Sequence, residues 1–245
     1  MGQKHDKLDL VYILGDASDW DNNEIRYSLR SSANFPHRNV FVIGERLTWL
    51  QNVIHIPYLD RHQVKTANGV AKIMRAARDK RISERFVLMN DDFFFLKKQR
   101  TVPYYYRGKT GEFIDQHRTK AGYYYQTLIN TEKFLIKRGI KNPKDYAVHA
   151  PIIYEKSHLR KLMSKELRGC SLRSVYCNLM KVRAKKTEDF KANTLDEFKY
   201  QIHRKAPIFS SSDEIVKERT FLDWISTKFP NSSKYELDNW QINLI

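Results

Sequence analysis

The sequence predicts an α/β fold, with a mainly parallel central sheet flanked by helices and a mainly helical C-terminal part. Short apolar runs rich in β-branched residues alternate with helical patterns as far as residue 98. Two acidic clusters directly follow such runs, at the strand ends where open α/β sheets bind their ligands. No stretch rich in Pro, Gly and Ser divides the 245 residues, so we expect one domain over residues 1–245.

The first 98 residues contain the elements that predict the sheet. The run LDLVYIL is apolar and β-branched enough for a buried strand, and it ends at GDASDWDNNE, which contains Asp16, Asp19 and Asp21. The next segment begins at Asn22 or Asn23, either of which is a suitable helix cap. The expected elements are strands at 8–14, 39–45, 52–58 and 85–91, and helices at 23–35 and 66–81.

Two further patterns concern surfaces. The helix at 66–81 is amphipathic, with a basic outer face. That face is expected to contain Lys72, Arg75, Arg78 and Lys80. The aromatic stretches VPYYYRGKTGEF and AGYYYQTLIN are interpreted as a hairpin or a lid, and the run FFFLKK as core and pocket wall.

Composition limits the classes of partner and compartment. The formal net charge of +16 favours a polyanionic partner, although charge alone predicts neither fold nor reaction. Cys170 and Cys177 are the only cysteines, so neither a zinc site nor a disulfide framework is indicated. The charged start MGQKHDKLDL differs from a signal peptide, and no apolar run reaches the length of a membrane span. We expect a cytoplasmic protein without a membrane span.

The most informative motif is Asn90-Asp91-Asp92, directly after the apolar run RFVLM. Two adjacent acids at the end of a buried strand are costly unless they face water or a cation. Mg²⁺ and Mn²⁺ prefer oxygen ligands and commonly join one or two carboxylates to substrate phosphates. The motif therefore predicts a metal site for a nucleotide diphosphate, with a solvated acid pair as the alternative.

Several ordered segments resemble the Stealth family of sugar-1-phosphate transferases, which includes capsular-polysaccharide enzymes. They are DLVYILGDASDW, NNEIRYSLRSSANFPHRNVFVIGERLTWLQNVIHIPY, TANGVA and ISERFVLMNDDFFF, followed by VHAPIIYEKSHLRKLM, GCSLRSVYCNLM, SSSDE and KFPNSSKYE. The resemblance implies a glycosyltransferase-A-like fold, a nucleotide-sugar donor such as a UDP-sugar, and a divalent metal. It divides the chain into a donor-binding half, 1–98, and an acceptor-side half, 99–245.

The resemblance also implies roles for individual residues. The implied set is His149, Asp213 and Asp92 for catalysis, Asp91 and Asp92 for the metal, and Asp9, Glu24, Arg26, Asn68, Asn90 and Arg173 for the donor. The two arginines suit phosphate oxygens, and His149 or Asp213 suits a general base. Alternatives remain open for Asp213 as a helix cap, for His149 as a turn residue, for Arg173 as an ion-pair partner, and for Glu24 or Arg26 as a surface residue.

The expected activity is transfer of a sugar or sugar-1-phosphate to a hydroxyl of a polyanionic acceptor. Exposed basic runs such as KKQR and VRAKK, with tyrosines near them, suit a phosphate backbone and an extruded base. We therefore expect hydroxymethylated phage DNA as the acceptor, with the protein in the host cytoplasm. The alternatives are a capsular-polysaccharide sugar-1-phosphate transferase, a non-enzymatic nucleic-acid-binding protein and a phosphohydrolase.

Overall fold

The computed structural model describes residues 7–15, 18, 20–116, 122–162, 167 and 169–237. Eight helices are described: α1 (Asn23–Ser31), α2 (Lys65–Arg78), α3 (Thr110–Gln116), α4 (Tyr123–Lys137), α5 (Lys156–Lys161), α6 (Leu172–Leu179), α7 (Leu195–His203) and α8 (Arg219–Lys228). The central sheet consists of β1 (Leu8–Ile13), β2 (His37–Gly44), β3 (Ile54–Pro57), β4 (Arg85–Asn90) and β9 (Ile152–Glu155).

The central sheet is mostly parallel, which confirms the predicted α/β class. Its order is β3-β2-β1-β4-β9, and only β9 runs antiparallel to its neighbour. The carboxyl ends of β1, β2 and β4 therefore lie along one edge. Gly44 ends β2 with φ of 138°, and a Cβ there would lie 2.0 Å from the carbonyl oxygen of Leu14. The close approach of the two chains at this edge requires glycine.

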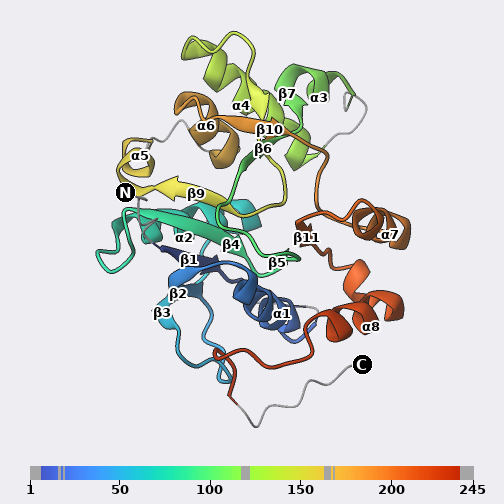
Figure 1. Cartoon of the computed structure of the whole chain (residues 1–245). Helices are drawn as coiled ribbons and strands as arrows, with labels where there is room; N and C mark the ends of the chain where they lie inside the picture. Colours follow the sequence, from blue (N-terminus) through green and yellow to red (C-terminus); the bar gives the residue numbers. More distant parts are fainter. Residues whose placement is uncertain are drawn as a thin grey trace, which may run out of the picture.

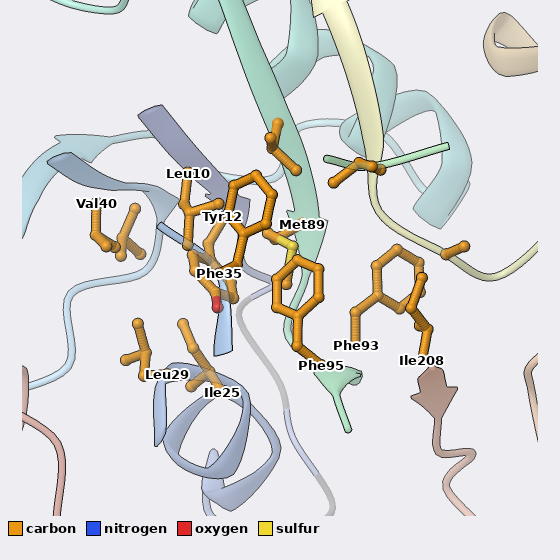
Figure 2. Close-up of a cluster of buried hydrophobic side chains, with 14 of the residues drawn as sticks. Leu10, Tyr12, Ile25, Leu29, Phe35, Val40, Met89, Phe93, Phe95 and Ile208 are labelled. Carbon is orange, nitrogen blue, oxygen red and sulfur yellow. The ribbon is translucent and has the colours of Figure 1, made fainter. Parts of the chain in front are cut away.

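Helices cover both faces of the sheet (Figure 1). On one face Leu10, Tyr12 and Met89 pack against Ile25 and Leu29 of α1 (Figure 2). On the other face the core joins sheet residues to α2, α5 and α6. The alternation of buried side chains along β1 explains this arrangement, because successive strand residues point to opposite faces.

The run FFFLKK begins with β5 (Phe93–Phe95), which pairs antiparallel with β11 (Ile208–Ser210). Phe93 and Phe95 pack in the α1 core, whereas Phe94 packs in a separate cluster with residues of α7 and α8. All three phenylalanines are buried. The prediction that this run is core and pocket wall is confirmed, because Phe93 also lines a cavity described below.

The predicted tyrosine hairpin is wrong. The first stretch contributes β6 (Tyr104–Tyr106), which pairs parallel with β10 (Ala184–Lys186), and also β7 (Gly108–Lys109), which pairs with β8 (Lys144–Asp145). The second stretch is the start of α4. The buried positions of α4 include Leu128, Thr131 and Leu135, which have the spacing of one helical face. The three tyrosines at the start of the helix concealed this pattern in the sequence.

Two expectations about helices also need correction. The helix beginning at 23 has Asn22 as its cap residue, but Asn22 is left-handed (φ 57°) and makes no capping side-chain hydrogen bond; Asn23 is already helical. In α2, Lys72 is buried rather than on the basic outer face, whereas Arg75 and Arg78 are exposed as expected. Among the described residues, no helix combines the length and apolar character needed to cross a bilayer.

Candidate functional site

The acids Asp91 and Asp92 lie at the carboxyl end of β4, as the sequence predicts. Asn90, the last residue of β4, pairs with Ile13 at the end of β1, so the chain leaves both strands at this place. The backbone N–H of Asp92 donates to Oδ1 of Asp91 over 3.1 Å, and the N–H of Ser211 donates to the carbonyl of Asp92 over 3.2 Å. The segment after β11 thus fixes the acid pair from the other side.

A cavity of about 470 Å³ opens beside the pair, and we refer to it as the acidic cavity. It lies where ends of β1, β4 and β11 meet the start of α2. Its charged lining consists of the carboxylates of Glu24, Asp60, Asp91, Asp92 and Asp213 and the ammonium groups of Lys65, Lys72 and Lys191. Gly69 of α2 also lines it, and the missing side chain there leaves the helix backbone open to the cavity.

Asp91 and Asp92 have fewer partners than their charge requires. Burial raises the pKa of Asp91 to about 7, and the charges of Asp92 and Glu24 add to the effect. Burial also raises the pKa of Asp92, although Lys191 and the hydroxyl of Ser210 act against it. Within the described residues, Oδ1 of Asp92 is buried and accepts no hydrogen bond. Such a pair is stabilised by a cation.

A divalent cation fits this donor set. Mg²⁺ takes oxygen ligands and typically binds one or two carboxylates together with water and substrate phosphates. In the part of the chain that the structure describes, no three His, Cys, Asp or Glu side chains are grouped closely enough to hold an ion alone. Two adjacent carboxylates match the number that Mg²⁺ commonly takes from a protein when a substrate phosphate supplies further ligands.

Two of the three lysines that line the acidic cavity, Lys72 and Lys191, lie within 4 Å of a carboxylate oxygen. The ammonium of Lys72 lies 2.6 Å from Oδ1 of Asp60 and donates to the carbonyl of Leu14 over 2.6 Å. Lys191 lies 3.8 Å from Oδ2 of Asp92, with about a quarter of its side chain exposed. Lys72 already has two partners, whereas the positive charge of Lys191 acts on Asp92.

A second cavity, of about 620 Å³, adjoins the first and is named the His149 cavity. Asn90 and Lys191 line both cavities. In the His149 cavity, Nδ1 of His149 lies 2.8 Å from Oδ2 of Asp189, and the backbone N–H of His149 donates to Oδ1 of the same carboxylate over 2.8 Å. Asp189 thus fixes both the ring and the backbone of His149. The alternative that His149 is only a turn residue loses support.

The Asp189 carboxylate is itself well compensated. Burial alone would raise its pKa, but the hydrogen bonds with His149 and the nearby Arg107 hold the pKa at about 2. Arg107 also bonds Asp145, so it connects the His149 cavity to β8. Arg173 donates to the carbonyls of Val148 and Ala150 over 2.7 Å each. Arg173 therefore shapes the loop that presents the imidazole, and its η1 nitrogen is not free for phosphate.

Two implied donor residues lie away from the cavities. Asp9 is fully buried near the amino end of β1, where its carboxylate binds Arg38 and Ser83. Arg26 is buried in α1 and binds Glu236 over 3.1 Å. It is therefore not a surface residue, and it lines neither of the two cavities. Both residues hold distant segments together instead.

Of the implied donor residues Glu24 and Asn68, Glu24 lines the acidic cavity and Asn68 does not. Glu24 is buried, accepts a hydrogen bond from Ser18 over 2.8 Å and has a pKa raised by burial. Asn68 is bonded to the backbone of Arg61 and His62, so it orders the loop before α2 rather than facing the cavity. The alternative of a plain surface position is therefore wrong for Glu24, whereas its implied role in donor binding stays a prediction.

Asp213 is exposed on the rim of the acidic cavity. It does not cap a helix, because the short 3-10 helix at Ile215–Lys217 has Glu214 as its cap residue and the N–H of Ile215 donates to Ser212. Asp16 and Asp19, in the other predicted acidic cluster, lie outside the described residues.

Sequence reasoning missed Asp189, Lys191 and the inward Lys72. Asp189 and Lys191 lie in TEDFKAN, a segment without periodicity. They reach the site because Ser210 of β11 donates to the carbonyl of Phe190 over 3.1 Å and Ala192 donates back to Ser210 over 3.0 Å. The alternation Asp-Phe-Lys, with Phe190 buried in the core, is the one local signal that could have found them.

No family model matches the sequence, and no curated protein matches it.

Proposed function

We propose that this protein is a metal-dependent transferase that uses a nucleotide sugar and moves a sugar or a sugar-1-phosphate to a hydroxyl group. The observation that carries the proposal is the pairing of two adjoining cavities: one with an uncompensated acid pair, the other with an oriented histidine. A transferase needs both, because donor and acceptor must meet at one point. The resemblance to the Stealth family supports the same reaction class.

The acidic cavity would bind the donor. Asp91 and Asp92 would hold a divalent cation, which supplies charge neutralisation for the diphosphate when bound. Asn90 and Lys191 line both cavities, so a donor bound there would have its reacting bond next to the second cavity. The backbone of α2 near Gly69 offers a surface on which a phosphate can approach closely.

The His149 cavity would bind the acceptor. With Nδ1 of His149 bonded to Asp189, Nε2 is the nitrogen that can take the proton of an acceptor hydroxyl. The hydroxyl oxygen then forms the new bond to the anomeric carbon or to phosphorus, and the electron pair of the broken bond goes to a phosphate oxygen of the nucleotide. Asp189 stabilises the imidazolium that results and preserves the ring orientation.

The acceptor would be polyanionic, and hydroxymethylated DNA is our choice. The exposed Lys185 and Lys186 precede the segment that carries Asp189 into the His149 cavity. Tyr124, which is 43% exposed, lines the same cavity and Tyr123 is its exposed neighbour. Lysines can follow a phosphate backbone, and an aromatic ring can contact an extruded base.

A nucleotide-sugar panel tests the proposal. Wild-type protein is incubated with Mg²⁺ or Mn²⁺, each nucleotide sugar in turn, and hydroxymethylated DNA, unmodified DNA or an anionic polysaccharide. The expected result is nucleotide release that needs both metal and hydroxymethylated DNA, with a mass gain of the DNA equal to one sugar or one sugar phosphate. Transfer to polysaccharide alone would refute the DNA assignment; release without any acceptor would indicate a hydrolase; no release with any pair would refute the transferase.

A further inference from the structure

Among the residues that the structure describes, Lys191 is the charged residue that lines both cavities. Asn90 and Lys191 are the residues common to both linings, and Asn90 is uncharged. The Lys191 ammonium lies 3.8 Å from Oδ2 of Asp92, beyond the range of a strong hydrogen bond. The Lys191 ammonium therefore lies near Asp92 without forming a close hydrogen-bonded ion pair with it.

The backbone around Lys191 is fixed. The residue forms an isolated parallel bridge with Ser210, and the next residue, Ala192, donates to the Ser210 carbonyl over 3.0 Å. Ser210 also donates its hydroxyl to Oδ2 of Asp92 over 2.8 Å. Ser210, at the end of β11, thus contacts both the backbone around Lys191 and the carboxylate of Asp92. Because its backbone is fixed, Lys191 starts from a defined position beside the acid pair, where it can reach a ligand in either cavity.

We propose that Lys191 is a further catalytic residue, whose ammonium contacts the nucleotide phosphate that leaves when the donor bond breaks. This assignment rests on the proposed function. In both possible reactions the acceptor hydroxyl loses its proton to His149, a bond forms from its oxygen, and the electron pair of the broken bond goes to a phosphate oxygen. That oxygen gains about one negative charge, and a fixed cation next to it stabilises the product side more than the intact donor.

The same position should make Lys191 lower the affinity of the acid pair for a metal, whereas it raises the affinity for the leaving nucleotide. A positive charge close to Asp92 opposes a divalent cation at the acid pair, because like charges repel and because the ammonium partly satisfies the carboxylate. Removal of the charge should therefore strengthen metal binding and weaken binding of the leaving nucleotide. A residue that only maintained the fold would not change these two affinities in opposite directions.

The test compares Lys191→Met, Lys191→Arg and, as a matched control, Lys199→Met, which removes an exposed lysine of α7. Calorimetry measures Mn²⁺ alone, and then UDP, UMP and UDP-glucose at saturating Mn²⁺. For Lys191→Met we expect Mn²⁺ to bind about tenfold tighter. UDP or UMP should bind about tenfold more weakly, with UDP-glucose changed less than about threefold. Lys191→Arg and Lys199→Met should stay close to wild type.

The outcomes separate this assignment from the proposed function. Loss of affinity that is equal for UDP, UMP and UDP-glucose, or no loss for any of them, would overturn the role of Lys191 while leaving the transferase intact. Mn²⁺ affinity that is unchanged in Lys191→Met would also overturn it. Failure of the wild-type protein to bind Mn²⁺ and UDP would overturn the proposed function together with this assignment.

Discussion

Two regions of the molecule contain carboxylates that are shielded from water: the surroundings of Glu236, which lies against helix α1, and the acid pair after β4. They differ in how far positive groups compensate the negative charge. Arg26 and Arg30 both bind the carboxylate of Glu236, at 3.1 Å and 2.7 Å, and the backbone N–H of Ser233 donates to it over 2.7 Å. Burial would raise the pKa of Glu236, but the bonds to Arg30 and Ser233 hold it below its usual value. We call this group the Glu236 clasp.

The acid pair at the end of β4 is the opposite case. Burial raises the pKa of Asp91 to about 7 and also raises that of Asp92. In the clasp, a deeply buried carboxylate meets two guanidinium groups. In the pair, Asp92 has the ammonium of Lys191 at 3.8 Å, and the neighbouring carboxylate charge of Asp92 acts on Asp91. The ion pairs of the Glu236 clasp join the C-terminal segment to α1. Buried carboxylates without such partners, as in the acid pair, instead indicate a ligand site. The difference separates residues that build the fold from residues that we propose serve the reaction.

The largest expected effect is on turnover. Asp91→Asn should lower nucleotide release in the presence of metal and acceptor by at least about 1000-fold, because it removes a ligand of the proposed metal. The exposed Asp223→Asn in α8 is the matched control and should keep full turnover. Turnover of Asp91→Asn within about tenfold of wild type would place the chemistry elsewhere.

The next effect concerns stability of the clasp. Glu236→Gln should lower the free energy of unfolding by about 3–5 kcal/mol, because Arg26 would be left buried without a counterion. Chemical denaturation measures the change, and the exposed Glu214→Gln provides the control, with an expected change below about 0.5 kcal/mol. A loss in Glu236→Gln no greater than that of the control would remove the distinction between the two regions.

A smaller effect is expected for the orientation of His149. Asp189→Asn should lower turnover by about 10–100-fold while Mn²⁺ affinity stays unchanged, because Asp189 contacts the histidine and not the acid pair. The measurement is a pH–rate profile together with Mn²⁺ titration. An unchanged rate with a normal profile would show that His149 needs no orientation by Asp189.

The smallest effect is a pH dependence of the metal-free protein. The pKa of Asp91 is raised above its unfolded value, so its contribution to stability is present below about pH 4 and is lost as pH rises through about 7. Asp91→Asn should therefore become more stable than wild type by about 1–3 kcal/mol at pH 8, with the difference shrinking toward pH 5. Thermal unfolding across this range checks the slope. Parallel curves for the two proteins would contradict the raised pKa.

The sheet and the acid pair could be predicted because both are local in sequence. An apolar run followed by Asp91-Asp92 specifies a strand with two acids directly after its end. The helical start of α4 could not be recognised from its three tyrosines, since burial there follows positions such as Leu128 and Leu135 further along. Composition alone was misleading at this segment.

The second half of the site depends on long-range contacts. Asp189 and Lys191 reach β4 only because their segment pairs with β11, which in turn pairs with β5. The local alternation Asp-Phe-Lys suggests a strand-like segment, but it does not reveal which strands that segment meets. The motif resemblance had the opposite limitation: it singled out Asp9 and Arg26, whose contacts are structural. The sequence singled out buried polar residues, and their contacts in the structure were needed to distinguish residues that line the cavities from residues that hold the fold together.

The central claim is that Asp91 and Asp92 bind a nucleotide diphosphate through a divalent metal. Titration calorimetry of UDP-glucose into wild type and Asp91→Asn, each with and without Mn²⁺, tests it most directly. We expect binding by the wild-type protein only when Mn²⁺ is present, and no binding by Asp91→Asn in either condition. Equal affinity of the two proteins for UDP-glucose, or wild-type affinity that does not depend on Mn²⁺, would contradict the claim.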